Sequence, residues 1–324
     1  MDSKISGTWT GFLLLCWLAV APCCNVHAAD GDAAEPGMAP EASEAVLPAQ
    51  AVEGPPPEAD ALAKLFESGM EALSQKDYEV AYQALRRAAA QGHAGAQAAL
   101  AGMLLRGQGV VVNLPEAVKW NRLAAEQGDA EGQAALGLMY AQGVGVGRDD
   151  EVALSWLRQA AGQGHAGAQG ALGMMYRDGR GVASNESVAA EWFRLAAIQG
   201  EPSAQNSIAT SFRDGRGVEK DEVEAAWWFR QAAEKGDAEA QANLGLMYRQ
   251  GRGVHQDDIE AVQWFRQAAE QGSALGEYYL GVSYTEGRGL EQDAAEGSEW
   301  LEKALAQGLV AAQVYLRSGT QQEQ

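Results

Sequence analysis

Glycine pairs separated by one residue recur along this chain, and paired glycines beside a helix start could bind phosphate. A phosphate-binding loop follows a strand and usually ends in lysine followed by serine or threonine. Here a helical pattern precedes each pair, and no lysine follows in register. We therefore predict that the glycines adopt backbone angles that fold one helix back on another. The six pairs are Gly107/Gly109, Gly143/Gly145, Gly179/Gly181, Gly215/Gly217, Gly251/Gly253 and Gly287/Gly289.

Other residue types that could do chemistry do not form clusters. The sequence contains four histidines and no His-Glu-x-x-His, Gly-x-Ser-x-Gly or Ser-x-x-Lys motif. His93 and His165 begin equivalent segments two repeats apart, so we read them as surface residues at helix starts. All three cysteines, Cys16, Cys23 and Cys24, lie near the N-terminus. The sequence therefore predicts no catalytic site, no metal ligands and no cofactor.

The glycine pairs belong to a repeat of 36 residues that begins at His93 and ends at Gly308. One tryptophan occupies the same position of every repeat, and we assign Trp156, Trp192, Trp228 and Trp264 to packing and not to ligand stacking. An arginine stands between the glycines of the last four pairs, where we expect it to brace neighbouring repeats. The tryptophans are Trp120, Trp156, Trp192, Trp228, Trp264 and Trp300.

Each repeat predicts two helices. Leu136 and Tyr140 fall on one face of the first helix. Gly137 lies between them at a cost of about 1 kcal/mol to the helix, which indicates close packing against the second helix. The second helix begins with a capping residue such as Asp257, and Glu260 follows three residues later, as in a capping box.

The pattern Leu-Gly-x-Met-Tyr, Gly-x-Gly-Val and Ala-x-x-Trp-Phe-x-x-Ala-Ala-x-x-Gly covers residues 93–308 and resembles the Sel-one-like repeat family. These repeats are related to tetratricopeptide repeats. The resemblance implies an all-α fold, a right-handed α-solenoid of helix pairs, here with about fifteen helices and no sheet. Residues 61–92 resemble a tetratricopeptide-like N-terminal unit, and residues 309–324 are expected to form a capping helix and tail.

The N-terminal part has a different composition. Residues 11–20 are an apolar run too short to cross a membrane, so residues 1–28 read as a signal peptide. Lipid attachment and an uncleaved anchor remain alternatives. Residues 29–60 are rich in Pro and Ala, acidic and free of Lys and Arg, which predicts a disordered linker. We expect a periplasmic or secreted protein with no transmembrane segment in its mature chain.

The resemblance implies a non-catalytic scaffold that binds a partner protein or peptide on its concave face. The net charge of −20 argues against nucleic acid as the partner. The alternative is an envelope hydrolase of the β-lactam or peptidoglycan-amide type, as suggested for cysteine-rich relatives, whose paired cysteines are absent here. The sequence gives no prediction of the oligomeric state.

Tetratricopeptide arrays also suggest, by analogy, which residues line the concave face. The tenth position of the repeat then contributes Leu138, Met174 and Leu246, and the thirteenth contributes a row of three arginines. Arginine binds carboxylates through its planar fork, so the row predicts an acidic or carboxylate-ended partner. Pairing of these arginines with neighbouring acids of this chain is the alternative. The row consists of Arg177, Arg213 and Arg249.

Overall fold

The computed structural model of the protein describes residues 59–322, and the predicted signal peptide and almost all of the predicted linker lie outside these residues. The described part contains fifteen helices and no strand, which confirms the all-α prediction. The first helices of the pairs are α2 (Ala59–Ser74), α4 (Ala94–Arg106), α6 (Ala130–Gln142), α8 (Ala166–Asp178), α10 (Pro202–Asp214), α12 (Ala238–Gln250) and α14 (Ala274–Glu286), and α16 (Val310–Gln322) ends the array. The second helices are α3 (Tyr78–Ala90), α5 (Leu114–Glu126), α7 (Asp150–Gly162), α9 (Glu186–Ile198), α11 (Glu222–Glu234), α13 (Asp258–Glu270) and α15 (Ala294–Ala306).

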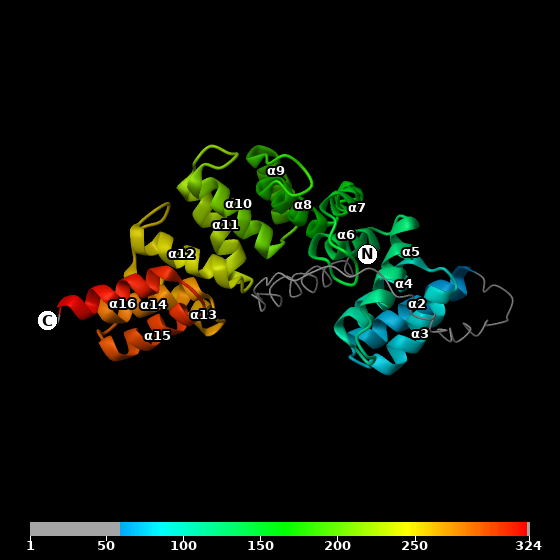
Figure 1. Cartoon of the computed structure of the whole chain (residues 1–324), viewed down its shortest axis with the longest axis horizontal. Helices are drawn as coiled ribbons and strands as arrows, with labels where there is room; N and C mark the ends of the chain where they lie inside the picture. The colour runs from blue at the N-terminus through cyan, green and yellow to red at the C-terminus, as the bar shows by residue number, and fades with distance from the viewer. Residues whose placement is uncertain (1–58, 323–324) are drawn as a thin grey trace, which may run out of the picture.

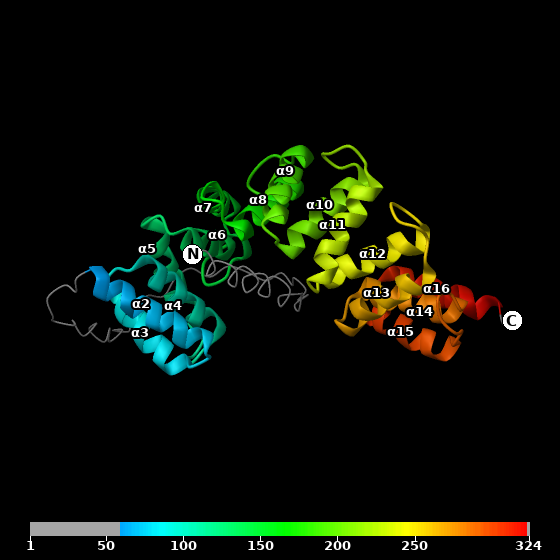
Figure 2. The same ribbon diagram turned by 180° about the vertical axis from the view of Figure 1, so that it is seen from behind.

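The helix pairs follow one another along an arch, from α2 at one end to α16 at the other (Figure 1). The view from behind shows the same curved array (Figure 2). First helices of neighbouring pairs contact each other, as α4 does α6 and α12 does α14, whereas the second helices of the described residues approach less closely. Elements on the inner side of a curved array lie closer together than those on its outer side. The row of first helices therefore lies on the inner side of the curve. The fold is therefore an α-solenoid whose inner surface is built from the first helices.

A glycine in the first helix lets the second helix pack closely, as the sequence predicted. A Cβ atom added at Gly137 would lie 2.7 Å from Leu157 Cγ of the second helix. At Gly173 it would lie 2.5 Å from the ring of Phe193. The cost of glycine in a helix is therefore offset by the burial of a large side chain, because Leu157 and Phe193 are both almost completely buried.

The paired glycines make the turn between the two helices and also join consecutive repeats. Gly143 has φ of 73° and ends α6, and Gly145 has φ of 70°. Both values lie in the left-handed region that glycine adopts without strain. A Cβ at Gly145 would lie 2.9 Å from the carbonyl oxygen of Leu114, at the start of the preceding second helix. The prediction that the paired glycines fold one helix back on another is confirmed. The second glycine of the pair also permits close contact between repeats.

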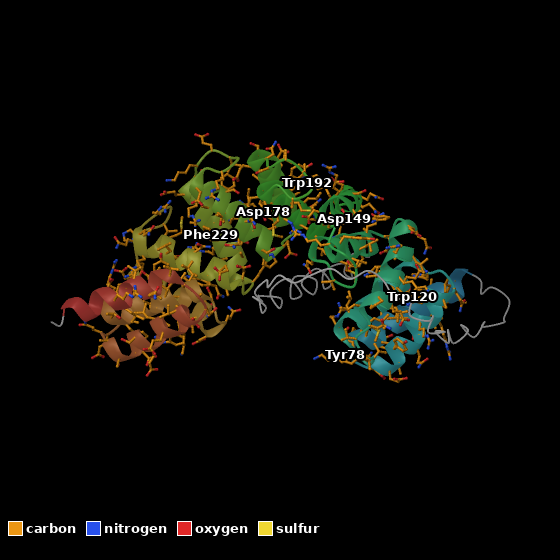
Figure 3. All side chains as sticks on the ribbon, viewed as in Figure 1. Tyr78, Trp120, Asp149, Asp178, Trp192 and Phe229 are labelled. Atoms are coloured by element: carbon orange, nitrogen blue, oxygen red, sulfur yellow. The ribbon has the colours of Figure 1, made fainter. Side chains whose placement is uncertain are left out.

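The recurrent tryptophans lie on the second helices, where Figure 3 labels Trp120 and Trp192. Trp228 is buried, and the other five are half-buried against the core. The indole N–H of Trp264 donates to Glu260 at 3.0 Å, and the same bond recurs at Trp120, Trp228 and Trp300. Their assignment to packing agrees with this placement.

The capping-box prediction is only half correct. The backbone N–H of Glu260 donates to Asp257 Oδ1 at 3.0 Å, as a cap requires. The carboxylate of Glu260 accepts the bond from Trp264 and does not return to the backbone N–H of Asp257. That N–H instead donates to the carbonyl oxygen of Tyr248 at 3.0 Å and closes the loop onto the first helix.

Buried glutamines, which the sequence analysis did not identify, connect consecutive repeats. Gln133 Nε2 donates to the carbonyl oxygen of Ala125, and Gln163 Nε2 donates to Gln133 Oε1 at 2.8 Å. The first bond joins consecutive repeats. The second lies within one repeat and recurs in four others, with Glu277 in place of the accepting glutamine in the last. Lys235 replaces the donating glutamine beside Gln205 and bonds to the carbonyl oxygen of Gly200 instead. Gln205 Oε1 is consequently buried without a hydrogen-bond partner.

Candidate functional site

The inner surface of the solenoid, formed by the first helices, is the candidate functional site. Its composition changes along the array at the seventh, tenth and thirteenth positions of the repeat. The first 36-residue repeat has small or aliphatic side chains there, namely Ala99, Gly102 and Leu105. The last has Tyr279, Val282 and Thr285. Larger side chains therefore cover the inner surface at its C-terminal end, and smaller side chains leave it more open at its N-terminal end.

The three predicted arginines lie on this surface, and each is paired with an acid of this chain. Arg177 Nε lies 2.7 Å from Asp178 Oδ1, and Arg213 Nε lies 2.8 Å from Asp214 Oδ1. Arg249 reaches the next repeat, where its Nη2 lies 2.6 Å from Glu286 Oε2.

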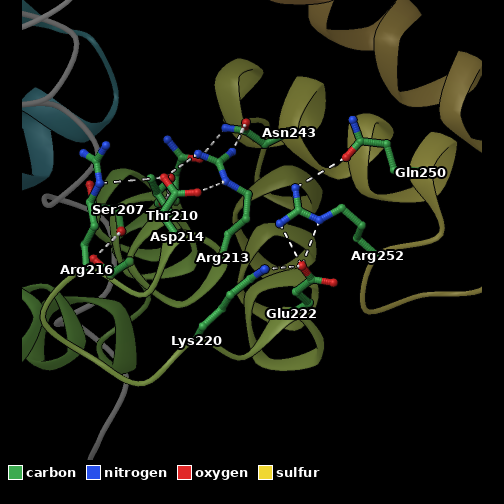
Figure 4. Close-up of polar contacts among 12 residues, drawn as sticks. Ser207, Thr210, Arg213, Asp214, Arg216, Lys220, Glu222, Asn243, Gln250 and Arg252 are labelled. Carbon is green, nitrogen blue, oxygen red and sulfur yellow. Dashed lines mark hydrogen bonds and ion pairs between the residues drawn. The ribbon is translucent and has the colours of Figure 1, made fainter.

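Arg213 shows how these contacts join repeats (Figure 4). Its second fork nitrogen donates to Asp214 Oδ2, and its Nη1 donates to Asn243 Oδ1 of the next repeat at 2.9 Å. Its guanidinium also lies 5.7 Å from the ring centroid of Phe229. These hydrogen bonds from Arg213 hold the pKa of Asp214 below its usual value.

The exposure of the row falls along the array. The side chain of Arg177 is 39 % exposed, that of Arg213 20 % and that of Arg249 9 %. The apolar residues predicted beside the arginines, Leu138, Met174 and Leu246, are half-buried and pack against the cores of their repeats. Arg177 is therefore the member of the row most accessible to a partner.

Three of the four arginines between paired glycines brace neighbouring repeats, as predicted, whereas Arg216 lies 4.0 Å from Asp214 of its own repeat. Arg288 Nη2 lies 2.8 Å from Asp258 Oδ1 of the preceding repeat. Arg252 contacts Glu222 at 2.8 Å, a pair that Figure 4 shows beside Lys220. Arg180 contacts Asp150 at 2.6 Å, and hydrogen bonds from Arg148 and Arg180 lower the pKa of Asp150 to about 2.

The two histidines at helix starts are caps and are less exposed than predicted. His93 Nδ1 accepts from the backbone N–H of Ala96, and His165 Nδ1 accepts from that of Ala168, both at 3.1 Å. The side chain of His165 is only 10 % exposed, and its Nε2 lies 3.0 Å from Glu131 Oε2. Within residues 59–322 no group of histidine, cysteine, aspartate and glutamate side chains could hold a metal ion.

A cavity of about 230 Å³ opens at the N-terminal end of the inner surface. The sequence analysis did not predict it, although repeat alignment contains a signal: Asn121 occupies a position where the other five 36-residue repeats have leucine or phenylalanine. Helices α2, α4, α5 and α6 contribute residues to its walls. Its lining comprises Phe66, Met70, Gly95, Ala98, Ala99, Gly102, Leu105, Arg106, Asn121, Asp129, Glu131 and Ala135.

The polar groups of the cavity differ in their environments. Asn121 is 1 % exposed, and its Oδ1 has no hydrogen-bond partner. Asp129 caps α6 by accepting from the backbone N–H of Gly132, and burial raises the pKa of its carboxyl group. Arg106 Nε donates to Gln108 Oε1 at 3.0 Å.

No helix within residues 59–322 is both long and apolar enough to cross a membrane.

Comparison with solved structures gives similar solenoids. A Sel1 repeat protein from Oxalobacter formigenes is 33 % identical, with a TM-score of 0.68, over 76 % of this chain and 97 % of that one. A protective antigen of uropathogenic Escherichia coli strains, which displays an SLR fold, is 34 % identical, with a TM-score of 0.65. That match covers 79 % of this chain but only 56 % of the antigen. A search of curated proteins gives no match.

The repeats also match a sequence family directly. The Sel1 repeat profile matches residues 59–93, 94–129, 130–165, 166–201, 202–237, 238–273 and 274–309. The seven matches are contiguous, and each boundary falls between one helix pair and the next. The chain therefore belongs to the Sel1 repeat family.

Proposed function

We propose that this protein is a non-catalytic scaffold that binds a partner protein or peptide on the inner surface of its solenoid. The single observation that carries the proposal is the contrast between two kinds of position. The glycines, tryptophans and helix caps that build the repeats recur in every 36-residue repeat, whereas the residues at the inner seventh, tenth and thirteenth positions change along the array. A surface that varies on a constant frame is suited to specific recognition.

The arginine row supports an acidic or carboxylate-ended segment as the ligand. Each arginine already has a carboxylate neighbour, so a partner's carboxylate must share or displace it. Arg177 is the position best placed for this, because both Arg177 and Asp178 are about 40 % exposed. Arg249 contributes less, since its side chain is almost buried against Glu286.

The proposal also places the protein outside the cytoplasm. Its basis is the apolar run at residues 11–20 followed by an acidic, proline-rich segment, which together resemble a signal peptide and a spacer. Determining the N-terminal residue of the protein purified from cell-envelope and medium fractions tests export, and an intact N-terminus in the cytoplasm would contradict it.

Site-specific photo-cross-linking in the native cell tests the use of the inner surface. p-Benzoylphenylalanine is introduced at positions 138, 174 and 246 of the inner surface, and at the exposed Trp227 of the second helix α11 as the control. We expect the inner positions to cross-link one common partner that the control does not capture. Cross-linking at position 227 alone would contradict the proposal.

Enzymatic activity is tested separately. The purified chain is incubated with nitrocefin and with peptidoglycan, and hydrolysis is followed over time. We expect no turnover. Hydrolysis that is lost on a point substitution would show that the chain is an enzyme and would refute the scaffold proposal.

A further inference from the structure

Gly102 lines the N-terminal cavity at a position where the other five 36-residue repeats have leucine, methionine, threonine or valine. Ala98, Ala99 and Gly102 form its floor on α4. In the last repeat the equivalent positions hold Tyr278, Tyr279 and Val282. Small residues on a helix surface let another group approach the backbone closely, so this part of the inner surface can accept a bulky side chain.

Asn121 adds an unusual polar group to this space. Its equivalents in the other 36-residue repeats are all apolar and buried: Leu157, Phe193, Phe229, Phe265 and Leu301. Asn121 Nδ2 lies 3.4 Å from Met139 Sδ, a weak acceptor, while Oδ1 has no partner. A buried acceptor without a donor destabilises the protein. The carbonyl oxygen of Asn121 therefore offers an unused hydrogen-bond acceptor beside the cavity.

The C-terminal repeats show which group fits such a space. There the ring of Tyr279 stacks on Phe265, with ring centroids 5.1 Å apart. The residues equivalent to Phe265 and Tyr279 at the N-terminal end are Asn121 and Ala135, and both line the cavity. The space that the chain fills with its own aromatic ring at one end is thus left open at the other.

The walls fit an aromatic ring with a polar edge. Phe66 and Met70 of α2 and Leu105 of α4 supply apolar surface. The volume of about 230 Å³ is below the roughly 300–1,000 Å³ of pockets for drug-sized ligands, which indicates one side chain as the occupant. Buried tryptophan and tyrosine side chains require a partner for their N–H or O–H group, and Asn121 Oδ1 can accept it.

We propose that the cavity between α2, α4 and α6 binds a tryptophan or tyrosine side chain of the partner, with its N–H or O–H donating to Asn121 Oδ1. The proposal rests on the proposed function in that the partner lies along the inner surface. It adds that the anchor of the interaction is aromatic and sits at the N-terminal end of that surface, away from the arginine row.

Saturation-transfer NMR on the purified full chain tests the cavity without the partner. The probes are N-acetyl-tryptophanamide, its 1-methyl derivative, which lacks the indole N–H, and N-acetyl-leucinamide. We expect the tryptophan amide to bind about fivefold more tightly than its methyl derivative, as the loss of one hydrogen bond requires. Equal binding of the tryptophan and leucine amides would overturn the proposal.

Two variants locate the binding. Gly102→Leu places in the cavity the side chain that Leu138 and Leu246 have at the same position of other repeats. A Cβ at Gly102 would meet only the flexible end of Arg106, so the helix can accept it. We expect Gly102→Leu to weaken binding of the tryptophan amide at least fivefold, equivalent to about 1 kcal/mol. The matched control is Thr210→Leu, at the same position of a distant repeat, which should bind as the wild type does.

Asn121→Ala tests the hydrogen bond while keeping the cavity open. In this variant the tryptophan amide and its methyl derivative should bind equally, and circular dichroism and melting curves establish that each variant folds. Unchanged binding in Gly102→Leu, or a methyl effect that persists in Asn121→Ala, would overturn the proposal. If inner-surface cross-links persist while the amides fail to bind, the cavity inference is wrong and the scaffold proposal stands. If the amides bind as expected and only position 227 cross-links, the cavity inference stands and the scaffold proposal is wrong.

Discussion

The buried carboxyl group of Glu201 should make the stability of the solenoid depend on pH. Glu201 stands at the start of α10, where the other 36-residue repeats have His, Asp or Ser as a capping residue. It makes no capping hydrogen bond, is 4 % exposed, and its Oε2 has no partner. Burial raises the pKa of Glu201 to about 7 from an ordinary value of 4.5.

The groups that face Glu201 do not cancel this effect. The backbone N–H of Ser203 favours its ionised form, as do Lys235 and His165, and Asp237 opposes it. The loss of hydration on burial is nevertheless the largest contribution to the raised pKa. The native state therefore keeps a proton on Glu201 up to about pH 7, whereas the unfolded chain loses it near pH 4.5. The protonated Glu201 carboxyl group contributes fully to stability below pH 4.5. Its contribution falls as the pH rises from 4.5 to about 7 and is absent at higher pH.

The size of the effect follows from the difference in pKa. One pKa unit corresponds to about 1.4 kcal/mol, so the two values set an upper bound of about 3.4 kcal/mol. Water and Lys235 near the carboxylate reduce this bound, and we expect about 1–3 kcal/mol. For a chain of this size, that change shifts the melting temperature by roughly 2–5 °C.

The assay compares Glu201→Gln with the wild type in melting curves from pH 4 to pH 8. The glutamine variant should match the wild type near pH 4 and should become more stable than it by several degrees at pH 8. Glu219→Gln, which changes an exposed carboxylate, is the matched control. Its melting temperature should change with pH as that of the wild type does. A constant difference between Glu201→Gln and the wild type across this range would refute the reasoning.

Three further predictions concern packing, the turns and the cavity. Trp228→Ala should destabilise the protein by about 3–5 kcal/mol in denaturant unfolding, whereas its half-exposed neighbour Trp227→Ala should cost much less. Gly253→Ala should cost about 2 kcal/mol or more in the same assay, because the new Cβ would be strained and would also clash with the preceding repeat. Gly236→Ala, with strain but open space, should cost about 1 kcal/mol. Asn121→Leu should raise the free energy of unfolding by about 1–3 kcal/mol, since it removes an unpaired buried oxygen, and an unchanged value would show that Oδ1 is hydrated.

The fold was predictable because its determinants are local and are repeated many times. The helical spacing of apolar residues, the capping residue of the second helix and the paired glycines each act within one repeat. Gly145 and Trp264, for example, perform roles that their spacing alone predicts. A signal that is weak in one repeat becomes strong when it recurs at a fixed step.

Contacts between repeats were less predictable, because they depend on how the repeats stack. Arg249 pairs with Glu286, a residue 37 positions away, and no feature of the sequence favours this acid over the many others. The bond from Trp264 to Glu260 is local, but it displaces the expected capping-box bond only because the loop brings another acceptor to the Asp257 N–H. The cavity likewise depends on α2, which lies before the first 36-residue repeat.

Departures from the repeat carry the functional information, because the constant positions are explained by the fold. In a solenoid each repeat contacts its neighbours, so a costly residue weakens adjoining interfaces and leaves the rest intact. Two groups of residues depart in this way: Glu201 with Lys235, and Asn121 with Gly102. The first group breaks the glutamine connection and buries a carboxyl group, which ties stability to pH. The second group opens a cavity with an unused acceptor, and a partner that supplies an aromatic donor would recover the stability that the open repeat loses.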